Sequence, residues 1–332
     1  MSKTVIWAAL VGLAVSTGAV LWLGAGQILN AILSIGWIGL VYVVSWQLAV
    51  YLLLGLAWWV VCPGASLWIV VWGRLVREGG VTCLPFSELG GVAFGARAVM
   101  LGGLSFARAA ASSIVDVITE GIALAPFLMF GLVMLLARKP GSPLAWPLAI
   151  GAGALLLGSA AAILQRTRLA RLLRTATAWL LQRWVKDAPQ RAEELHRAID
   201  ALFARPGRVA GASALHVLCW CGGAGNVWIG YHLLGARPTI LEALAIESCF
   251  SGILSVGFLM PGGLGVQELT YVGVGRLFGM PTPLSLALSL VRRARDLIIG
   301  GPALLVWQGI EASQLGRRGS PGAASRVVLP PS

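Results

Sequence analysis

The sequence predicts an all-α, polytopic integral membrane protein with about six full spans plus two re-entrant helical hairpins in inverted repeats. Three observations lead to this fold class. The 332 residues are 58% apolar and only 11% charged, and the mean hydropathy of +0.83 is far from that of soluble globular proteins. Apolar runs of roughly 20 residues, the length that crosses a bilayer, recur along the chain. Glycine and proline interrupt two further apolar stretches, so a count by hydropathy alone would give about seven or eight spans.

The net charge gives information about membrane topology and does not indicate a nucleic-acid partner. Lys+Arg number 25 and Asp+Glu number 13, which gives +12, but so few residues are charged that the excess belongs in loops and at the membrane surface. Nearly all of this positive charge is arginine, which binds phosphate through two hydrogen bonds and stays protonated. The five cysteines are an odd set that lies mostly in apolar runs, so no disulfide framework is expected.

The first two spans are uninterrupted apolar runs. Val5–Leu23 follows the lone Lys3 and exceeds the core of a typical signal peptide, so we expect it to remain as the first span. Ile38–Val61 is the second span and ends where proline and glycine stop the helix. Arg74 and Arg77 come next, and the positive-inside rule places them in the cytoplasm together with Lys3. The uncharged link between the two spans is then outside.

The next stretch is apolar but rich in glycine. Irregular backbone at membrane depth is tolerated where it lines a cavity or is buried in protein, so a re-entrant, broken helix is expected. Two spans follow, joined by a short basic turn. These elements are the broken helix Leu84–Gly103, with Glu88 and Arg97, and the spans Ala109–Ala137, with Asp116 and Glu120, and Trp146–Leu164.

Residues 166–208 change character abruptly. Leucines recur at helical spacing opposite a run of arginines, which predicts a cytoplasmic amphipathic connector. Contact with anionic lipids of the cytoplasmic leaflet is one interpretation, and a solvated link between the two halves of the bundle is the other.

The second half predicts two spans, a second broken segment and a tail. Proline and two glycines stop the broken segment, and a glycine-rich stretch leads back from it. In order, these elements are the span Ala210–Leu234, the segment Leu241–Met260 that stops at Pro261, Gly262 and Gly263, the span Leu284–Trp307, and a disordered cytoplasmic tail at residues 311–332.

The two halves are related by an internal repeat. A shift of about 176 positions aligns like residues, namely Pro85 with Pro261, Gly103 with Gly279, Ser113 with Ser289 and Glu120 with Asp296. Identities are few, and abundant glycine supplies some matches by chance. The charge rule puts the broken segments on opposite sides, so residues 38–137 and 209–310 form a first repeat and a second, inverted one. Such repeats expose a central site to the two sides in turn, which favours transport, and channels share the architecture.

Charged residues inside the spans are the main candidates for a lipid-binding site, because each is costly unless it is paired or faces water. Arg292, Arg295 and Asp296 lie together in the last span, and Asp116 and Glu120 share a helical face in the matching span. We expect Arg292 or Arg295 to bind an anionic lipid headgroup while the three acids hold these arginines in place. The alternative is a buried ion-pair network that only fastens the two repeats together.

The run from Met260 to Glu268 is a second candidate. Its glycines let the backbone approach a ligand, and a helix that begins after them would point its positive end at a negative group. Glu268 then lies in the first turn, either as a cap matched to the helix dipole or as an acid that lines the cavity. Further candidates, each more simply explained by a structural ion pair, are Glu88, Arg97 and Glu247.

The chain shows no catalytic or nucleotide-binding signature, so we expect neither an enzyme nor a cofactor. His216, Cys219 and Cys221 are close in sequence, but no fourth metal ligand is apparent and the two cysteines do not share a helical face. Neither a metal ion nor a nucleic acid is an expected partner.

Three segments carry a resemblance to a known family: Pro261 to Glu268 (PGGLGVQE), Ser289 to Gln308 (SLVRRARDLIIGGPALLVWQ) and Leu84 to Arg97 (LPFSELGGVAFGAR). The chain resembles the flippase-type family related to the membrane half of lysylphosphatidylglycerol synthase, and within it the hopanoid-biosynthesis-associated branch. The resemblance implies a single flippase-like transmembrane domain over residues 1–332. The chain departs from the family pattern after Gly90 and Gly91, where Val92 replaces an acid and Glu88 comes earlier, so a role for that acid does not carry over.

The resemblance implies a translocase that moves a hopanoid or an anionic phospholipid across or out of the bacterial inner membrane, with both termini in the cytoplasm. Expected partners are membrane lipids, and a second copy of the chain or lipid-biosynthesis proteins. Aminoacyl transfer is not expected, because the soluble synthetase domain of longer relatives is absent from this sequence. One alternative is a non-transporting membrane enzyme or scaffold of hopanoid or lipid biosynthesis, which would alter lipid composition and not sidedness. Another is a small-solute or ion transporter with a sealed polar pathway.

Overall fold

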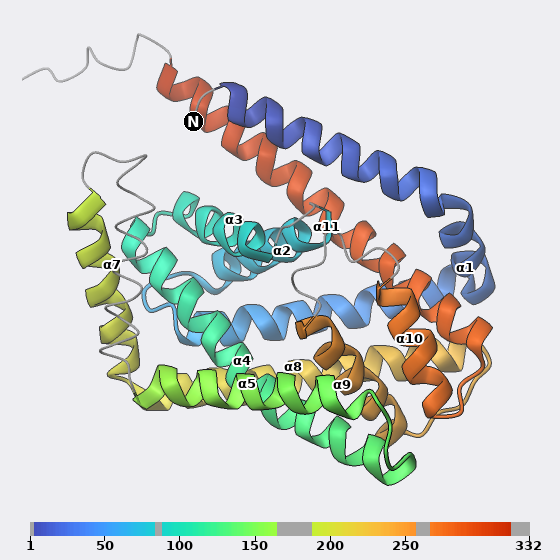
Figure 1. Ribbon diagram of the computed structural model, residues 1–332. Helices are drawn as coiled ribbons and strands as arrows, with labels where there is room; N and C mark the ends of the chain where they lie inside the picture. The colour runs from blue at the N-terminus through green and yellow to red at the C-terminus, as the bar shows by residue number, and fades with distance from the viewer. Residues whose placement is uncertain (1–2, 84–87, 165–187, 257–265, 320–332) are drawn as a thin grey trace, which may run out of the picture.

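The computed structural model describes residues 3–83, 88–164, 188–256 and 266–319, and within these ranges its regular structure is entirely helical (Figure 1). This agrees with the predicted all-α class. The helices are α1 (Lys3–Val60), α2 (Leu67–Cys83), α3 (Glu88–Leu101), α4 (Phe106–Arg138), α5 (Ala145–Leu164), α7 (Ala188–Phe203), α8 (Pro206–Leu233), α9 (Ile240–Val256), α10 (Val266–Leu277) and α11 (Thr282–Gly319).

The chain turns a corner inside α1. Gly36 has a φ of 69° and a ψ of 169°, a conformation that is available almost only to glycine, and it divides the helix into two arms. The first arm runs back alongside α11 (Figure 1). The uncharged link predicted between the first two spans is therefore helical, because the chain stays helical up to this glycine and bends there.

The second arm of α1 pairs antiparallel with α8. Trp58, near the end of α1, shares a hydrophobic cluster with Ala212, near the start of α8. Val43, near the start of the second arm, clusters with Ile229, near the end of α8. We call the end of the bundle that holds Trp58 the α7 end, because α7 covers it, and the opposite end the far end.

Two pairs of short helices form hairpins. α2 and α3 approach closely through glycine, since a Cβ atom on Gly91 would lie 2.7 Å from the carbonyl oxygen of Arg77. Their 17 and 14 residues extend over roughly 26 and 21 Å, short of the ~30 Å hydrocarbon core. The broken segment predicted at Leu84–Gly103 is thus the second arm of a larger hairpin, which begins at Leu67.

α9 and α10 form the corresponding hairpin in the second half, with 17 and 12 residues. α1 ends at the α7 end of the bundle, and α2 begins there. α8 ends at the far end, and α9 begins there, so the two hairpins enter the bundle from opposite ends (Figure 1). A shift of about 176 residues carries α2, α3 and α4 closely onto the bounds of α9, α10 and α11. The predicted stop at Pro261, Gly262 and Gly263 lies outside the described residues.

α7 is the described part of the predicted connector, and it lies across the α7 end of the bundle (Figure 1). Its buried Leu195, Ile199 and Leu202 join the cluster around Trp58, which leaves its charged residues at half-buried or exposed positions. Residues 165–187, with most of the predicted leucines and arginines, lie outside the described residues.

The last helix is longer than predicted. α11 continues to Gly319, so the prediction of disorder from residue 311 onward is wrong for its first part. Glu311 lies on this helix and forms an ion pair with Arg97 of α3 at 2.7 Å, which ties the end of α11 to the first hairpin. Residues 320–332 lie outside the described residues.

The outer surface suits a bilayer. Among the described residues, two helices are long and apolar enough to cross a membrane, Leu29–Val60 and Phe106–Arg138. Large exposed apolar side chains extend along α1, α4 and α5. Exposed tryptophans lie near both ends of the bundle, with Trp59 and Trp68 at the α7 end and Trp37 and Trp146 at the far end.

Candidate functional site

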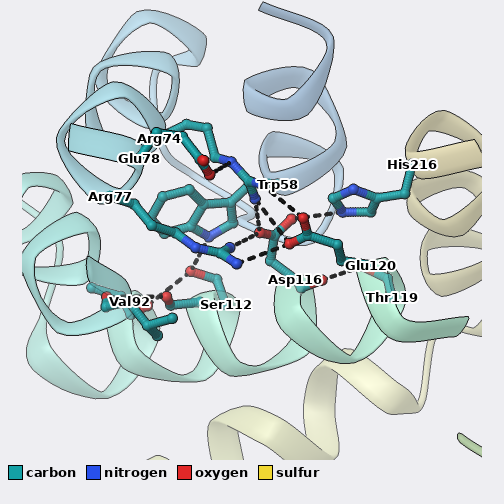
Figure 2. A network of polar contacts seen from close by, with 12 residues as sticks. Trp58, Arg74, Arg77, Glu78, Val92, Ser112, Asp116, Thr119, Glu120 and His216 are labelled. Carbon is teal, nitrogen blue, oxygen red and sulfur yellow. Dashed lines mark hydrogen bonds and ion pairs between the residues drawn. The ribbon is translucent and has the colours of Figure 1, made fainter. Parts of the chain in front are cut away.

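A first group of buried charges joins the α2–α3 hairpin to α4 and α8 (Figure 2). Arg74 and Arg77 both contact the Oδ2 atom of Asp116, at 3.0 and 2.8 Å, and they contact the two oxygens of Glu120 at 2.9 and 2.8 Å. The Nε atom of Arg74 also lies 2.8 Å from Glu78, one turn along α2. We call this group the first cluster; its members are Arg74, Arg77, Glu78, Asp116, Glu120 and His216.

Helical spacing produces the first cluster. Asp116 and Glu120 are four residues apart on α4 and the two arginines are three apart on α2, so each pair presents its charges on one face. The guanidinium of Arg74 is 2% exposed and Asp116 is fully buried. Because a buried guanidinium loses its hydration, direct contacts with carboxylates must replace the lost water.

The first cluster corrects two predictions. Arg74 and Arg77 lie inside the protein and not in a cytoplasmic loop, because carboxylates on α4 neutralise them. The positive-inside rule counts charges and takes no account of such partners. Asp116 and Glu120 bind Arg74 and Arg77. The prediction that they hold the arginines of the last span is therefore wrong.

Arg74, Arg77, Glu78 and His216 belong to the first cluster but were not among the predicted site residues, and His216 is the one that comes from α8. Its side chain is fully buried, and its Nε2 atom lies 3.1 Å from the Oδ1 atom of Asp116. Only metal binding with nearby cysteines had been considered for it, and among the described residues no group of His, Cys, Asp and Glu could hold a metal ion. The available signal was an ionisable side chain near the middle of a predicted span.

A second cluster, formed by Glu247 of α9, Tyr271 of α10 and Arg292 of α11, joins the other hairpin to the last helix. The Nη1 atom of Arg292 lies 2.7 and 2.8 Å from the two oxygens of Glu247, and it also contacts the Tyr271 hydroxyl. That hydroxyl donates a 2.7 Å hydrogen bond to Glu247. The ring of Phe250 lies 4.7 Å from the guanidinium carbon of Arg292. Glu247, a minor candidate in the sequence, is therefore the acid that holds Arg292.

The neighbouring charges of α11 have their own partners. Arg295 contacts its neighbour Asp296 at 2.6 Å. Arg293 contacts Glu268 at 2.9 Å. Glu268 lies in the first turn of α10, where a negative charge matches the helix dipole.

A small cavity lies between α1, α8, α10 and α11. Arg292 and Arg295 line it, together with Asn226 and Tyr271. Its volume of about 10 Å³ has room for roughly one water molecule. A lipid headgroup can enter only if the surrounding helices move apart.

The remaining predicted site residues lie apart from these clusters. Arg97 pairs with Glu311, and its side chain is one-third exposed, as expected of a structural ion pair near the surface. Glu88 is the first residue of α3, but its side chain lies outside the described residues, as do Pro261, Gly262 and Gly263.

The arrangement is suited to binding an anion. Arg292 and Arg295 reach one cavity from a helix that contacts both hairpins, and the hairpins enter from opposite ends. A model of a protein family, described as the lysylphosphatidylglycerol synthase TM region, matches residues 9–302. No curated protein and no solved structure gives a significant match.

Proposed function

This chain belongs to the family of the lysylphosphatidylglycerol synthase TM region and is a membrane protein, and we propose that it is a lipid translocase. Its substrate is an anionic phospholipid, or a hopanoid with a polar headgroup as in the hopanoid-associated branch. The lipid crosses or leaves the bacterial inner membrane with its headgroup inside the bundle and its tails in the bilayer.

In this proposal about six spans cross the bilayer: the two arms of α1, then α4, α5, α8 and α11. The two hairpins are re-entrant and belong to inverted repeats, in agreement with their entry from opposite ends. The exposed tryptophans near both ends of the bundle fit the two membrane interfaces. The α7 end faces the cytoplasm together with both termini, because the sequence that joins α5 to α7 is basic and α7 lies at that end.

The observation that carries the proposal is the presence of Arg292 and Arg295 at one cavity in the interior of the bundle. Among the described residues, Arg292 makes its polar contacts through Nη1 alone, and Arg295 through Nε and Nη2. Each guanidinium thus keeps N–H groups for an incoming phosphate, which arginine binds in a bidentate manner. Buried cations inside a membrane protein commonly mark a substrate pathway.

The test is reconstitution of the purified protein into liposomes that carry a fluorescent lipid. Transbilayer movement is measured separately for labelled phosphatidylglycerol, phosphatidylcholine and a labelled hopanoid. We expect the wild type to move phosphatidylglycerol or the hopanoid faster than phosphatidylcholine, and Arg292→Gln to lose this movement while the protein stays folded. Arg197→Gln, on the exposed face of α7, is the matched control and should move lipid like the wild type. If no lipid moves but the lipid composition of cells that lack the protein changes, the translocase proposal is wrong and the protein is a biosynthetic enzyme or scaffold.

A further inference from the structure

The first cluster has an excess of negative charge when His216 is neutral. Two arginines face three carboxylates, one on α2 and two on α4, at arginine–carboxylate distances of 2.8 to 3.2 Å. An unbalanced charge is costly in a low-dielectric interior. His216 contacts this cluster and can supply the missing positive charge, because an imidazole is positively charged when both ring nitrogens carry a hydrogen.

The ring of His216 has one nitrogen available for a proton. The Oδ1 atom of ionised Asp116 can only accept a hydrogen bond, so the Nε2 atom of His216, 3.1 Å away, carries a hydrogen. The other nitrogen, Nδ1, is buried and has no hydrogen-bond partner among the described residues. The hydroxyl oxygen of Ser213, one turn earlier on α8, is likewise buried and without a partner in that part of the chain.

We propose that Nδ1 of His216 is a proton-binding site and that its protonation drives lipid movement. The proton passes from water to Nδ1, while the Nε2–H group keeps its hydrogen bond to Asp116. The imidazolium then balances the charge of the first cluster. This inference rests on the proposed translocase function and names the proton gradient as its energy source.

The helices around His216 carry the charged and ionisable groups that affect its protonation. α8 also brings Asn226 to the cavity and lies against Glu247 at Gly223, about two turns beyond His216. The second arm of α1 carries no acid, base or histidine, and the acids and bases of α7 lie at half-buried or exposed positions. The ionisable groups of the surrounding elements include Arg74, Arg77 and Glu78 of α2, Arg108, Asp116 and Glu120 of α4, Cys219 of α8, Glu247 of α9, Arg292, Arg295 and Asp296 of α11, Tyr51 of α1, and Cys62 just beyond α1.

Packing links the proton site to the headgroup site. Both arginines of the first cluster are on α2 and contact Asp116, so a proton on His216, which balances the charge of this cluster, changes how strongly α2 is held to α4. α2 packs tightly on α11, since a Cβ atom on Gly79 would lie 2.6 Å from the carbonyl oxygen of Gly300. α11 carries Arg292 and Arg295. A proton and an anionic headgroup therefore bias the position of the same helix, which is the requirement for coupling between two sites.

The experiment compares the wild type with His216→Gln in liposomes that hold labelled phosphatidylglycerol, with and without an imposed pH gradient. We expect the gradient to accumulate lipid in one leaflet for the wild type. The variant should lose this accumulation and keep slow equilibration between the leaflets. His232→Gln is the matched control, because His232 is an exposed histidine on the same helix, and it should respond to the gradient like the wild type.

A second measurement does not depend on transport. Ring ¹⁵N NMR of the wild type in nanodiscs should show a histidine whose Nδ1 atom gains a proton as the pH is lowered, and this signal should be missing in His216→Gln only. An unchanged gradient response in His216→Gln, or lipid movement by the wild type that ignores the gradient, overturns the proton proposal and leaves the translocase intact. If the wild type moves no lipid, the translocase proposal fails. A His216 ring that does not titrate overturns the proton site in every case.

Discussion

Replacement of Asp116 with asparagine tests how strongly the first cluster stabilises the fold. The change removes one charge from a fully buried side chain that contacts Arg74 at 3.0 Å, Arg77 at 2.8 Å and His216 at 3.1 Å. The two arginines then have Glu120 as their one shared carboxylate. The remaining two arginines and two carboxylates still balance, but hydrogen bonds to a charged group, each worth about 1.5–3 kcal/mol, are lost, so the free energy of unfolding should fall by at least about 1.5–3 kcal/mol. SDS titration of the protein in detergent micelles, followed by circular dichroism, measures this change.

Two further variants make the measurement specific. Asp200→Asn removes an acid from the exposed face of α7, where the carboxylate is 52% exposed, and it should change the unfolding free energy by less than about 0.5 kcal/mol. Arg77→Gln combined with Asp116→Asn should destabilise the protein by less than the sum of the single changes, because the two side chains share one interaction. If Asp116→Asn unfolds within about 1 kcal/mol of the wild type, like an exposed pair, the cluster does not fasten α2 to α4 and the reasoning is refuted.

Three other substitutions test the packing. Gly79→Leu places a Cβ atom 2.6 Å from a carbonyl oxygen of α11 and should lower the unfolding free energy by about 1–3 kcal/mol in the same titration, whereas Gly153→Leu meets open space at its Cβ and should have little effect. Gly36→Ala forces a side chain into a conformation with a φ of 69° and should destabilise the protein by about 1–3 kcal/mol; a melting temperature equal to that of the wild type would contradict the sharp corner in α1. Arg97→Gln breaks a partly exposed pair with Glu311 and should change the unfolding free energy by less than about 1 kcal/mol, and a larger loss would mean that this pair anchors the end of α11.

Hydropathy located the long helices well, because an uninterrupted apolar run has one stable conformation in a bilayer. The run predicted at Ala109–Ala137 is α4 at Phe106–Arg138, and Trp146–Leu164 is α5 at Ala145–Leu164. The first hairpin was only half recognised. α2 carries Arg74 and Arg77, and without knowledge of their partners two arginines in a segment of this length indicate a loop.

The sequence by itself determined the class of protein and the presence of charges at membrane depth. It also put Asp116 and Glu120 on one helical face, since that depends only on the period of the helix. The tertiary structure decided which charges meet. Arg74 and Asp116 are 42 positions apart, and His216 is 100 positions from Asp116. Local spacing does not encode such pairings, because they depend on how separate helices cross and how closely glycines let them approach.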